Sequence, residues 1–187
     1  MNRGTTLEGL SARIVTLHEM LDSLHVVHQF GGAIALAWYR NPRATTDIDI
    51  NITLSPERSG PVLGALEHLG VTVTDLDRAV ILADGQARLV WGEALLDVFF
   101  ATLPLHDEMA TRARTVEFGP VQIPILSPED LIICKAVFGR PKDWVDIESM
   151  IGWGTEVDRS VVALWIDEIL GTSSPTLARL EELLTDS

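Results

Sequence analysis

Two carboxylates alternate with two isoleucines in the segment Asp47-Ile48-Asp49-Ile50, and this alternation constrains the fold more than any other feature of the chain. Successive side chains of a β-strand point to opposite faces, so both aspartates share one face and both isoleucines share the other. The isoleucine face belongs in a hydrophobic core. The segment therefore predicts a strand that carries a pair of carboxylates on its polar side.

A Gly-Gly turn precedes this strand. Gly31-Gly32 follows the stretch Val26–Phe30 and precedes a short apolar helix. Glycine lets the backbone approach a ligand closely, and a helix N-terminus presents free N–H groups to an anion. An ordinary strand-to-helix turn is the alternative. A phosphate-binding turn beside paired carboxylates suits a nucleoside triphosphate (NTP) with its Mg²⁺.

A third carboxylate lies in the apolar stretch Leu95-Leu-Asp-Val-Phe-Phe100. A lone charge in such a strand costs several kcal/mol unless it is paired or binds a metal ion. We expect Asp97 to converge with Asp47 and Asp49 from a neighbouring strand. Three carboxylates can hold two Mg²⁺ ions, and one of them can help to deprotonate an attacking hydroxyl.

Strand and helix patterns interleave irregularly along the chain, which predicts an α+β (mixed α/β) fold with a mixed β-sheet flanked by helices and extra C-terminal helices. The stretch from Asp75 is ambiguous between helix and strand, and we favour a helix. The expected helices are Leu7–Leu24, Ala33–Tyr39, Ser55–Leu69 with Ser55 as N-cap, Asp75–Ala83, His106–Arg114, Ser127–Phe138, Lys142–Ile151, Asp158–Leu170 and Ser174–Leu184. The expected strands are Val26–Phe30, Thr46–Thr53, Ala87–Trp91, Ala94–Ala101, Thr115–Phe118 and Val121–Ile125.

The length of 187 residues and a hydrophobic content of 47% allow one sizeable core. We expect residues 1–151 to form one domain that includes the N-terminal helix, and residues 152–187 to form a helical extension packed on it. No apolar run reaches the roughly 18 residues of a membrane span, and the N-terminus lacks a signal-peptide pattern. The single cysteine, Cys134, is expected to be buried. These features indicate a cytoplasmic protein without a membrane partner.

The net charge of −13 argues against a broad nucleic-acid-binding surface, because phosphate backbones require Lys and Arg. A local basic pocket stays possible. Arg40 and Arg43 flank the carboxylate motif, and Lys135, Arg140 and Lys142 cluster later in the chain.

Four pieces in order resemble a known family. Gly31-Gly32, the segment Arg43-Ala-Thr-Thr-Asp47-Ile-Asp49 and the later Asp97 are similar to motifs of the DNA polymerase β-type nucleotidyltransferase superfamily. Ser127-Pro-Glu-Asp-Leu-Ile-Ile-Cys-Lys135, followed by Gly139-Arg-Pro-Lys-Asp-Trp-Val-Asp146, resembles the AbiEii/AbiGii-type toxins of toxin–antitoxin pairs. The resemblance covers about residues 30–151. It departs from the superfamily at Gly32, where many members carry a serine.

The resemblance implies transfer of a nucleoside monophosphate (NMP) from an NTP to a hydroxyl. The acceptor is a tRNA, a protein or a small molecule, and a cognate antitoxin is an implied partner. The implied catalytic residues are Asp47, Asp49, Asp97 and Lys135, of which the three aspartates are also the metal ligands. The implied nucleotide-binding residues are Gly31, Gly32, Arg40, Arg43 and Asp146.

Plainer interpretations of these residues stay open. Lys135 can extend its ammonium group from an apolar helix to solvent. Asp143 and Asp146 can lie on a solvated helix face or in a first helical turn. Arg40 and Arg43 can form salt bridges only.

Three other functions also stay open. The first is a catalytically silent nucleotidyltransferase fold that acts as a binding or regulatory protein. The second is a regulator that docks a partner through its acidic C-terminal helices. The third is a metal-dependent nuclease, which would shorten RNA rather than extend it.

Overall fold

Six strands form a single mixed sheet in the computed structural model, which describes residues 9–185. The strands are β1 (His28–Phe30), β2 (Asp47–Ile52), β3 (Gln86–Trp91), β4 (Ala94–Phe100), β5 (Arg114–Phe118) and β6 (Val121–Ile125). Their order across the sheet is β3-β4-β2-β1-β6-β5. The pairs β2–β4 and β1–β6 are parallel, and the other neighbours are antiparallel. The predicted α+β class with a mixed sheet is confirmed.

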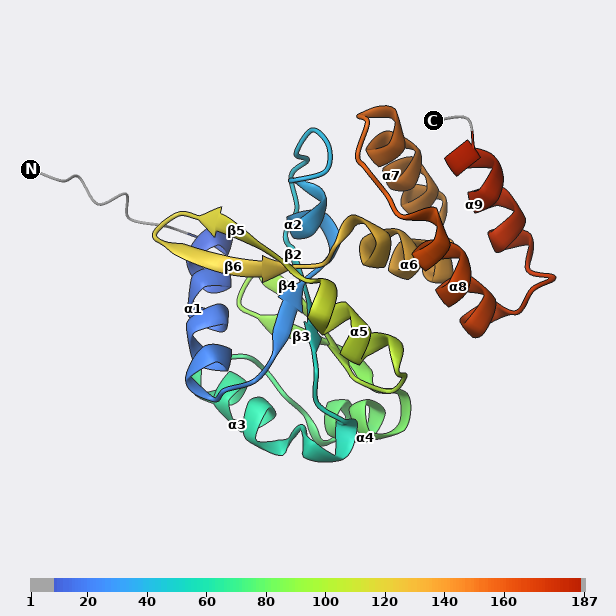
Figure 1. Cartoon of the computed structure of the whole chain (residues 1–187). Coiled ribbons are helices and arrows are strands. Elements are labelled where there is room, and N and C mark those ends of the chain that lie inside the picture. Colours follow the sequence, from blue (N-terminus) through green and yellow to red (C-terminus); the bar gives the residue numbers. More distant parts are fainter. Residues whose placement is uncertain (1–8, 186–187) are drawn as a thin grey trace, which may run out of the picture.

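Helices surround this sheet and continue beyond it (Figure 1). Those of the first two thirds are α1 (Leu10–Ser23), α2 (Gly32–Leu36), α3 (Gly60–His68), α4 (Asp75–Asp84) and α5 (Leu105–Arg112), with a 3₁₀ turn, η1, at Pro56–Arg58. The last four are α6 (Pro128–Phe138), α7 (Pro141–Gly152), α8 (Arg159–Leu170) and α9 (Pro175–Thr185). These four pack side by side, with α8 against α6 and α9 against α7 and α8.

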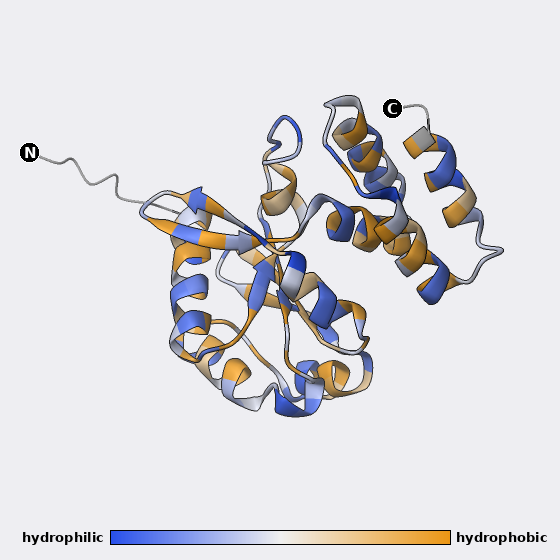
Figure 2. Ribbon diagram, in the orientation of Figure 1, coloured by the Kyte–Doolittle hydropathy of each residue, from blue (hydrophilic) through white to orange (hydrophobic). Residues whose placement is uncertain are grey.

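The alternation predicted for the carboxylate strand is present. Ile48 and Ile50 are fully buried, whereas Asp47 and Asp49 lie half-buried on the other face. Strand β4 alternates in the same way, with Asp97 on its less buried face. Figure 2 shows hydrophobic and hydrophilic residues interspersed along the helices and strands. The core thus fixes which face of β2 and β4 carries the carboxylates.

Several predicted boundaries were wrong. The helix expected from Ser55 is divided into η1 and α3, and Ser55 makes no capping hydrogen bond. The division falls before Pro61, which has no N–H to continue a helical ladder. Arg114, expected at the end of a helix, begins β5. Leu7, expected at the start of the first helix, lies outside the described residues.

Two later helices begin at residues whose side chains cap them. The Ser127 hydroxyl accepts a hydrogen bond from the Asp130 N–H at the start of α6, and Asp158 caps α8. Asp130 is fully buried and pairs with Arg112 of α5 at 2.6 Å, so α6 is held against α5. Among residues 9–185, no helix is long and apolar enough to cross a bilayer.

Candidate active site

One row of residues crosses three strands on the polar face of the sheet. Asp49 of β2 lies opposite Asp97 of the parallel strand β4. Arg88 of β3 lies opposite Asp97 from the other side. Asp47 lies two residues before Asp49 on the same face. The expectation that the three aspartates lie on neighbouring strands is therefore met by the register, and an arginine joins them.

Asp49 is the most strongly perturbed of these carboxyls. Burial, with the nearby negative charges of Asp97 and Asp47, raises the pKa of Asp49 to about 6, although Lys135 opposes this shift. No described side chain donates a hydrogen bond to it among the hydrogen bonds of residues 9–185. The two aspartates in contact across β2 and β4 thus repel each other in the ionised state.

The Gly-Gly turn lies directly against Asp49. The Gly31 N–H donates a hydrogen bond of 2.9 Å to the backbone oxygen of Asp49. Gly32 has φ +51°, and a Cβ added to it would overlap the Asp49 carboxylate. A serine at this position, as in many superfamily members, therefore does not fit this backbone. Only glycine allows the turn to approach the carboxylate so closely.

Arg88 was not identified from the sequence. Its Nε and Nη2 donate hydrogen bonds of 2.7 Å to the two carboxylate oxygens of Asp97. The hydrogen bond and charge of Asp97 raise the pKa of Arg88. The sequence did contain a signal, because the β3–β4 hairpin pairs Trp91 with Ala94 and counting three residues away along each strand reaches Arg88 and Asp97.

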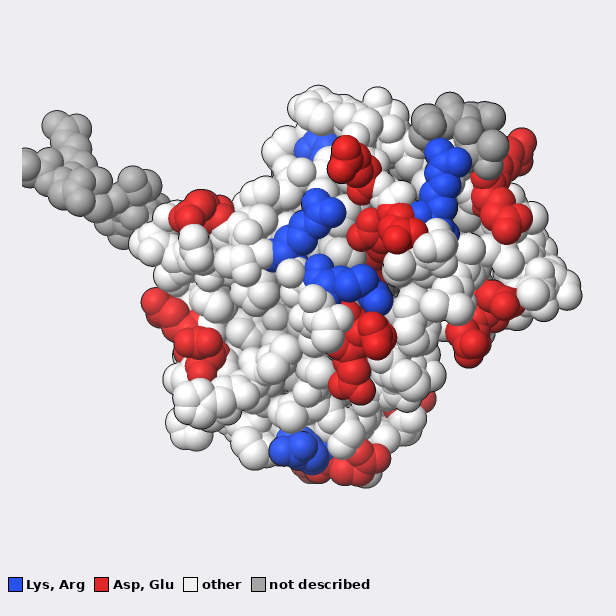
Figure 3. Space-filling model, viewed as in Figure 1, with Lys and Arg blue, Asp and Glu red and all other residues white. Residues whose placement is uncertain are grey.

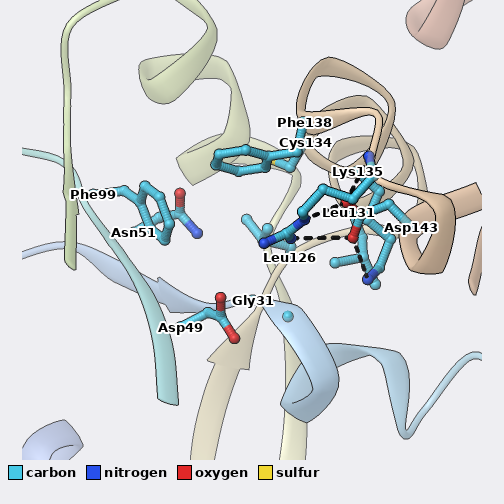
Figure 4. Close-up of a pocket in the computed structure, with 12 residues that line it drawn as sticks. Gly31, Asp49, Asn51, Phe99, Leu126, Leu131, Cys134, Lys135, Phe138 and Asp143 are labelled. Atoms are coloured by element: carbon cyan, nitrogen blue, oxygen red, sulfur yellow. Dashed lines mark hydrogen bonds and ion pairs between the residues drawn. The ribbon is translucent and has the colours of Figure 1, made fainter. Parts of the chain in front are cut away.

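Two adjoining pockets open over this face. The first, of about 420 Å³, is lined by Gly31, Gly32, Asp49, Asn51, Phe99, Leu126, Leu131, Cys134, Lys135, Phe138, Arg140 and Asp143. Figure 4 shows Asp49 and Phe138 on opposite sides of it, with Lys135 and Asp143 at its helical wall. The second, of about 510 Å³, contains Arg88 and Asp97 and shares Asp49, Phe99, Phe138 and Arg140 with the first. Asp49 and Asp97 therefore face adjoining pockets together with Lys135 of α6 and with Arg140, which lies between α6 and α7. Asp47 lines neither pocket.

Phe99 and Phe138 form an aromatic pair in both pockets. Their ring centroids are 6.0 Å apart in an edge-to-face arrangement. The Arg140 guanidinium lies 5.0 Å from the centre of the Phe138 ring. Phe138 is 47% exposed, although it is a large apolar side chain. An exposed aromatic ring at a pocket is a site where a flat ligand can stack.

A buried ionic cluster supports the helical wall. The Asp146 carboxylate contacts Lys135 Nζ at 2.8 Å and Arg40 and Arg43 at 3.3 Å each. Burial would raise the pKa of Asp146, but the hydrogen bond and charge of Lys135 and the charge of Arg43 outweigh it, so this pKa is lowered. Asp146 therefore organises three cations that come from two distant parts of the chain.

The cluster corrects the interpretations that placed Lys135, Asp143 and Asp146 in solvent, whereas Asp143 does lie in the first turn of α7, as the other interpretation had it. Lys135 is only 6% exposed and does not extend to solvent. Asp143 and Asp146 are 1% and 3% exposed, so neither lies on a solvated helix face. Asp143 accepts hydrogen bonds from Arg140 and lies 3.9 Å from Lys135 Nζ. The salt bridges considered for Arg40 and Arg43 are present, and both are made to Asp146.

Cys134 is only partly buried, whereas the sequence predicted a buried cysteine, and it lines the first pocket. Burial, chiefly, raises the pKa of the Cys134 thiol to about 12. The sulfur therefore stays protonated near neutral pH and is not a nucleophile.

The three carboxylates have the donor chemistry of a Mg²⁺ site. Three hard oxygen donors on one face, two of which repel each other, are the donor chemistry that such an ion prefers. However, no group of three or more His, Cys, Asp or Glu residues between residues 9 and 185 is arranged to hold a metal ion. Asp97 directs both of its oxygens to Arg88. The three residues therefore fit the ion in their chemistry, but in this arrangement they do not form a site for it, and Asp97 would have to leave Arg88 to bind one.

Comparisons with known proteins agree with this geometry. Residues 5–163 match the family described as "Nucleotidyltransferase of unknown function (DUF6036)". No curated protein matched the chain by sequence.

Solved structures share the fold at low sequence identity. The antibiotic-resistance factor ANT(2'')-Ia has 20% identity and a TM-score of 0.59, with coverage of 95% of this chain and 97% of that one. An antigenic nucleotidyltransferase-like protein from Paracoccidioides brasiliensis has 17% identity and a TM-score of 0.52, covering 91% and 92%. The lincosamide antibiotic adenylyltransferase LnuA has 14% identity and a TM-score of 0.53, covering 80% and 99%.

Proposed function

The chain belongs to the nucleotidyltransferase family DUF6036, and we propose that it transfers an NMP from an NTP to a hydroxyl acceptor in a Mg²⁺-dependent reaction. One observation carries this proposal. Asp47, Asp49 and Asp97 share one face of two adjacent strands, and Lys135 of α6 and Arg140 line the pocket above Asp49. Negative groups for metal ions and positive groups for phosphates therefore face each other.

In this proposal, Asp47, Asp49 and Asp97 hold the metal ions. When bound, these ions would neutralise phosphate charge and favour ionisation of the acceptor hydroxyl. Three carboxylates at one place cost less once a divalent cation is present, which is consistent with the raised pKa of Asp49.

The chain's other residues hold the triphosphate. The backbone at Gly31-Gly32 approaches the cleft without a Cβ in the way. Lys135 donates one N–H to Asp146 and has further N–H groups that can bind phosphate oxygens. Arg40 and Arg43 act through Asp146, which fixes Lys135, and in the structure they do not line either pocket over the carboxylates. This assigns them positioning roles rather than the direct phosphate contacts that the sequence suggested.

The reaction conserves all atoms. The acceptor oxygen forms a bond to the α-phosphorus, and the bond from this phosphorus to the oxygen bridging it to the β-phosphorus breaks. Pyrophosphate leaves with that electron pair. The acceptor proton passes to a carboxylate, for which Asp97 and Asp49 are placed on the side of the cleft that Arg88 borders.

The aromatic pair provides a place for the nucleobase. Phe138 is half-exposed and forms part of both pockets, so a base can stack on its free surface while the phosphates extend toward Asp49. Phe99 and Arg140 hold the ring of Phe138 in position.

For the acceptor, we favour a small cationic compound with hydroxyl groups. The net charge of −13 attracts such a compound and repels RNA. On the face drawn in Figure 3, Lys and Arg side chains lie beside acidic ones, and acidic side chains recur over α8 and α9. Two proteins with this fold act on antibiotics, since ANT(2'')-Ia was solved with adenylyl-2''-tobramycin and LnuA is a lincosamide adenylyltransferase.

A tRNA or protein acceptor, a role as the toxin of a toxin–antitoxin pair and a cytoplasmic location remain predictions from the sequence. One experiment distinguishes the acceptors. Purified protein is incubated with each NTP and MgCl₂, and with aminoglycosides, lincosamides, total tRNA or cell proteins, and the products are analysed by mass spectrometry. We expect an NMP mass increment on one acceptor class, lost with EDTA and with Asp49→Asn.

Other results would point elsewhere. Nucleotide binding without any mass increment would support the silent binding protein, and shortened RNA would support a nuclease. An increment that persists in Asp49→Asn would refute the assigned metal site.

A further inference from the structure

Arg88 engages the whole of the Asp97 carboxylate. Both Asp97 oxygens accept hydrogen bonds of 2.7 Å from the same guanidinium. The two residues face each other across β3 and β4, and Asp49 is the next residue of the same row. A cation that binds between Asp49 and Asp97 must therefore compete with a cation that the chain itself supplies.

The side chain of Arg88 is free to move away. It is 53% exposed, whereas that of Asp97 is 13% exposed, and β3 is an edge strand of the sheet. Among the residues that the structure describes, Asp97 is the only partner to which Arg88 donates a side-chain hydrogen bond. The guanidinium regains water when it leaves Asp97, so the pair opposes this departure only modestly, although it is bidentate and the carboxylate is mostly buried.

A second destination for Arg88 lies within the same cleft. Arg88, Asp97, Asp49 and Arg140 line one pocket together. Phosphate groups bound over the carboxylates would come within the reach of the guanidinium, and the planar fork of an arginine matches phosphate oxygens as well as it matches a carboxylate.

We propose that Arg88 guards Asp97: it competes with a divalent cation for this carboxylate in the free protein, and it moves to the phosphates when metal and nucleotide bind together. The proposal rests on the proposed function, because it requires a metal site at Asp47, Asp49 and Asp97. Its consequence is that the metal ion alone binds weakly and the metal–phosphate complex binds well. The site then fills with both components at once.

The first test measures Mn²⁺ binding without nucleotide by calorimetry. Removing the competing cation in Arg88→Gln should tighten Mn²⁺ binding about fivefold to tenfold, which corresponds to the weak contribution of such a pair. Arg78→Gln is the matched control, because Arg78 forms an exposed 2.7 Å pair with Glu67 and its loss changes the net charge equally. We expect this control to bind Mn²⁺ as the unaltered protein does. Circular dichroism verifies that each variant is folded.

The second test uses the complex of Mn²⁺ with inorganic tripolyphosphate, which needs no knowledge of the base. The measured quantity is the ratio of the dissociation constant of Mn²⁺ to that of Mn²⁺–tripolyphosphate. In Arg88→Gln this ratio should fall at least about tenfold, because the arginine no longer gains a phosphate partner. A merely structural role of Arg88 would change both constants in the same direction and leave the ratio unchanged.

A double variant tests whether Arg88 acts through Asp97. In an Asp97→Asn background, Arg88→Gln should no longer tighten Mn²⁺ binding, because the carboxylate for which the two cations compete is gone. Mn²⁺ binding that is equal in the unaltered protein and in Arg88→Gln overturns the proposed competition and leaves the metal site intact. Absence of Mn²⁺ binding in every variant overturns both the proposed competition by Arg88 and the proposed metal site.

Discussion

Asp49 and Asp97 lie opposite each other on two parallel strands, so that their carboxylates share one end of a largely apolar sheet. Only one of them has an arginine partner. Burial first, and then the neighbouring charge of Asp97, raise the pKa of Asp49, so its ionised form destabilises the folded protein.

Asp49→Asn should therefore increase stability while it removes activity. Without metal at pH 7.5, we expect unfolding to require about 2 to 3 kcal/mol more than in the unaltered protein, since the pKa rises from 3.8 to about 6. Nucleotidyl transfer should fall at least about 100-fold. Urea unfolding and the mass-increment assay measure the two effects, and a loss of both stability and activity would contradict the assigned repulsion.

The same carboxyl sets a pH dependence with a defined sign. Between about pH 4 and pH 6 the folded protein keeps a proton on Asp49 that the unfolded chain has released, so the stability contributed by this group falls as the pH rises through this window. The difference in unfolding free energy between Asp49→Asn and the unaltered protein should grow from pH 4 to pH 6 and then level off. A constant difference would refute the raised pKa.

Gly32→Ala should disable the site, because the new Cβ would overlap the Asp49 carboxylate and φ is +51°. We expect the free energy of unfolding to fall by at least about 1 kcal/mol. The free energy of Mn²⁺ binding should fall by a larger fraction of its value. Gly64→Ala is the control, since nothing lies within 4 Å of a Cβ at that position in α3. It should be neutral or stabilising, by up to about 1 kcal/mol.

Asp146→Asn should weaken the helical wall. It leaves Lys135, Arg40 and Arg43 without the carboxylate that holds them, at a cost of about 2 to 4 kcal/mol near pH 7. Because the pKa of Asp146 is lowered in the folded protein, this cost should begin to shrink as the pH falls below about 4 and should disappear only below that lowered pKa, where the folded unaltered side chain is also protonated. Unfolding curves at pH 7 and pH 3.5 test both statements.

Phe138→Ala should weaken nucleotide binding by about tenfold if the base stacks on this ring. Binding of Mn²⁺–tripolyphosphate, which has no base, should be unchanged. Trp153→Ala is a suitable control, because Trp153 is also an exposed aromatic residue but lines neither pocket over the carboxylates. Equal loss of tripolyphosphate binding would show that Phe138 supports the pocket rather than the base.

The sheet side of the site was predictable, because its signals are local. The alternation of Asp47 and Asp49 with isoleucines defines a strand face without reference to any other part of the chain. The apolar residues around Asp97 do the same for β4. Burial then decides the orientation of both strands, and the parallel register places the carboxylates together.

The helical side was not predictable in the same way. Asp146 meets Arg43 across 103 positions of sequence, and nothing near either residue indicates the pairing. The helix around Lys135 is apolar, a pattern that fits a lysine reaching solvent equally well. Here the tertiary structure buries a lysine that the local sequence would allow to reach solvent. Arg88 is intermediate, since the hairpin that pairs it with Asp97 spans only nine positions and its register can be counted.

The Asp146 cluster affects the order in which the two sides of the cleft can assemble during synthesis. Arg40 and Arg43 emerge from the ribosome long before α7, and until Asp146 appears their charges have no carboxylate to pair with at this place. The sheet face with its aspartates can form earlier, from residues up to β4. The helical wall is thus completed only after α7 has been made, and a nascent chain that lacks α7 has the aspartate-bearing half of the cleft without the half that Asp146 holds together.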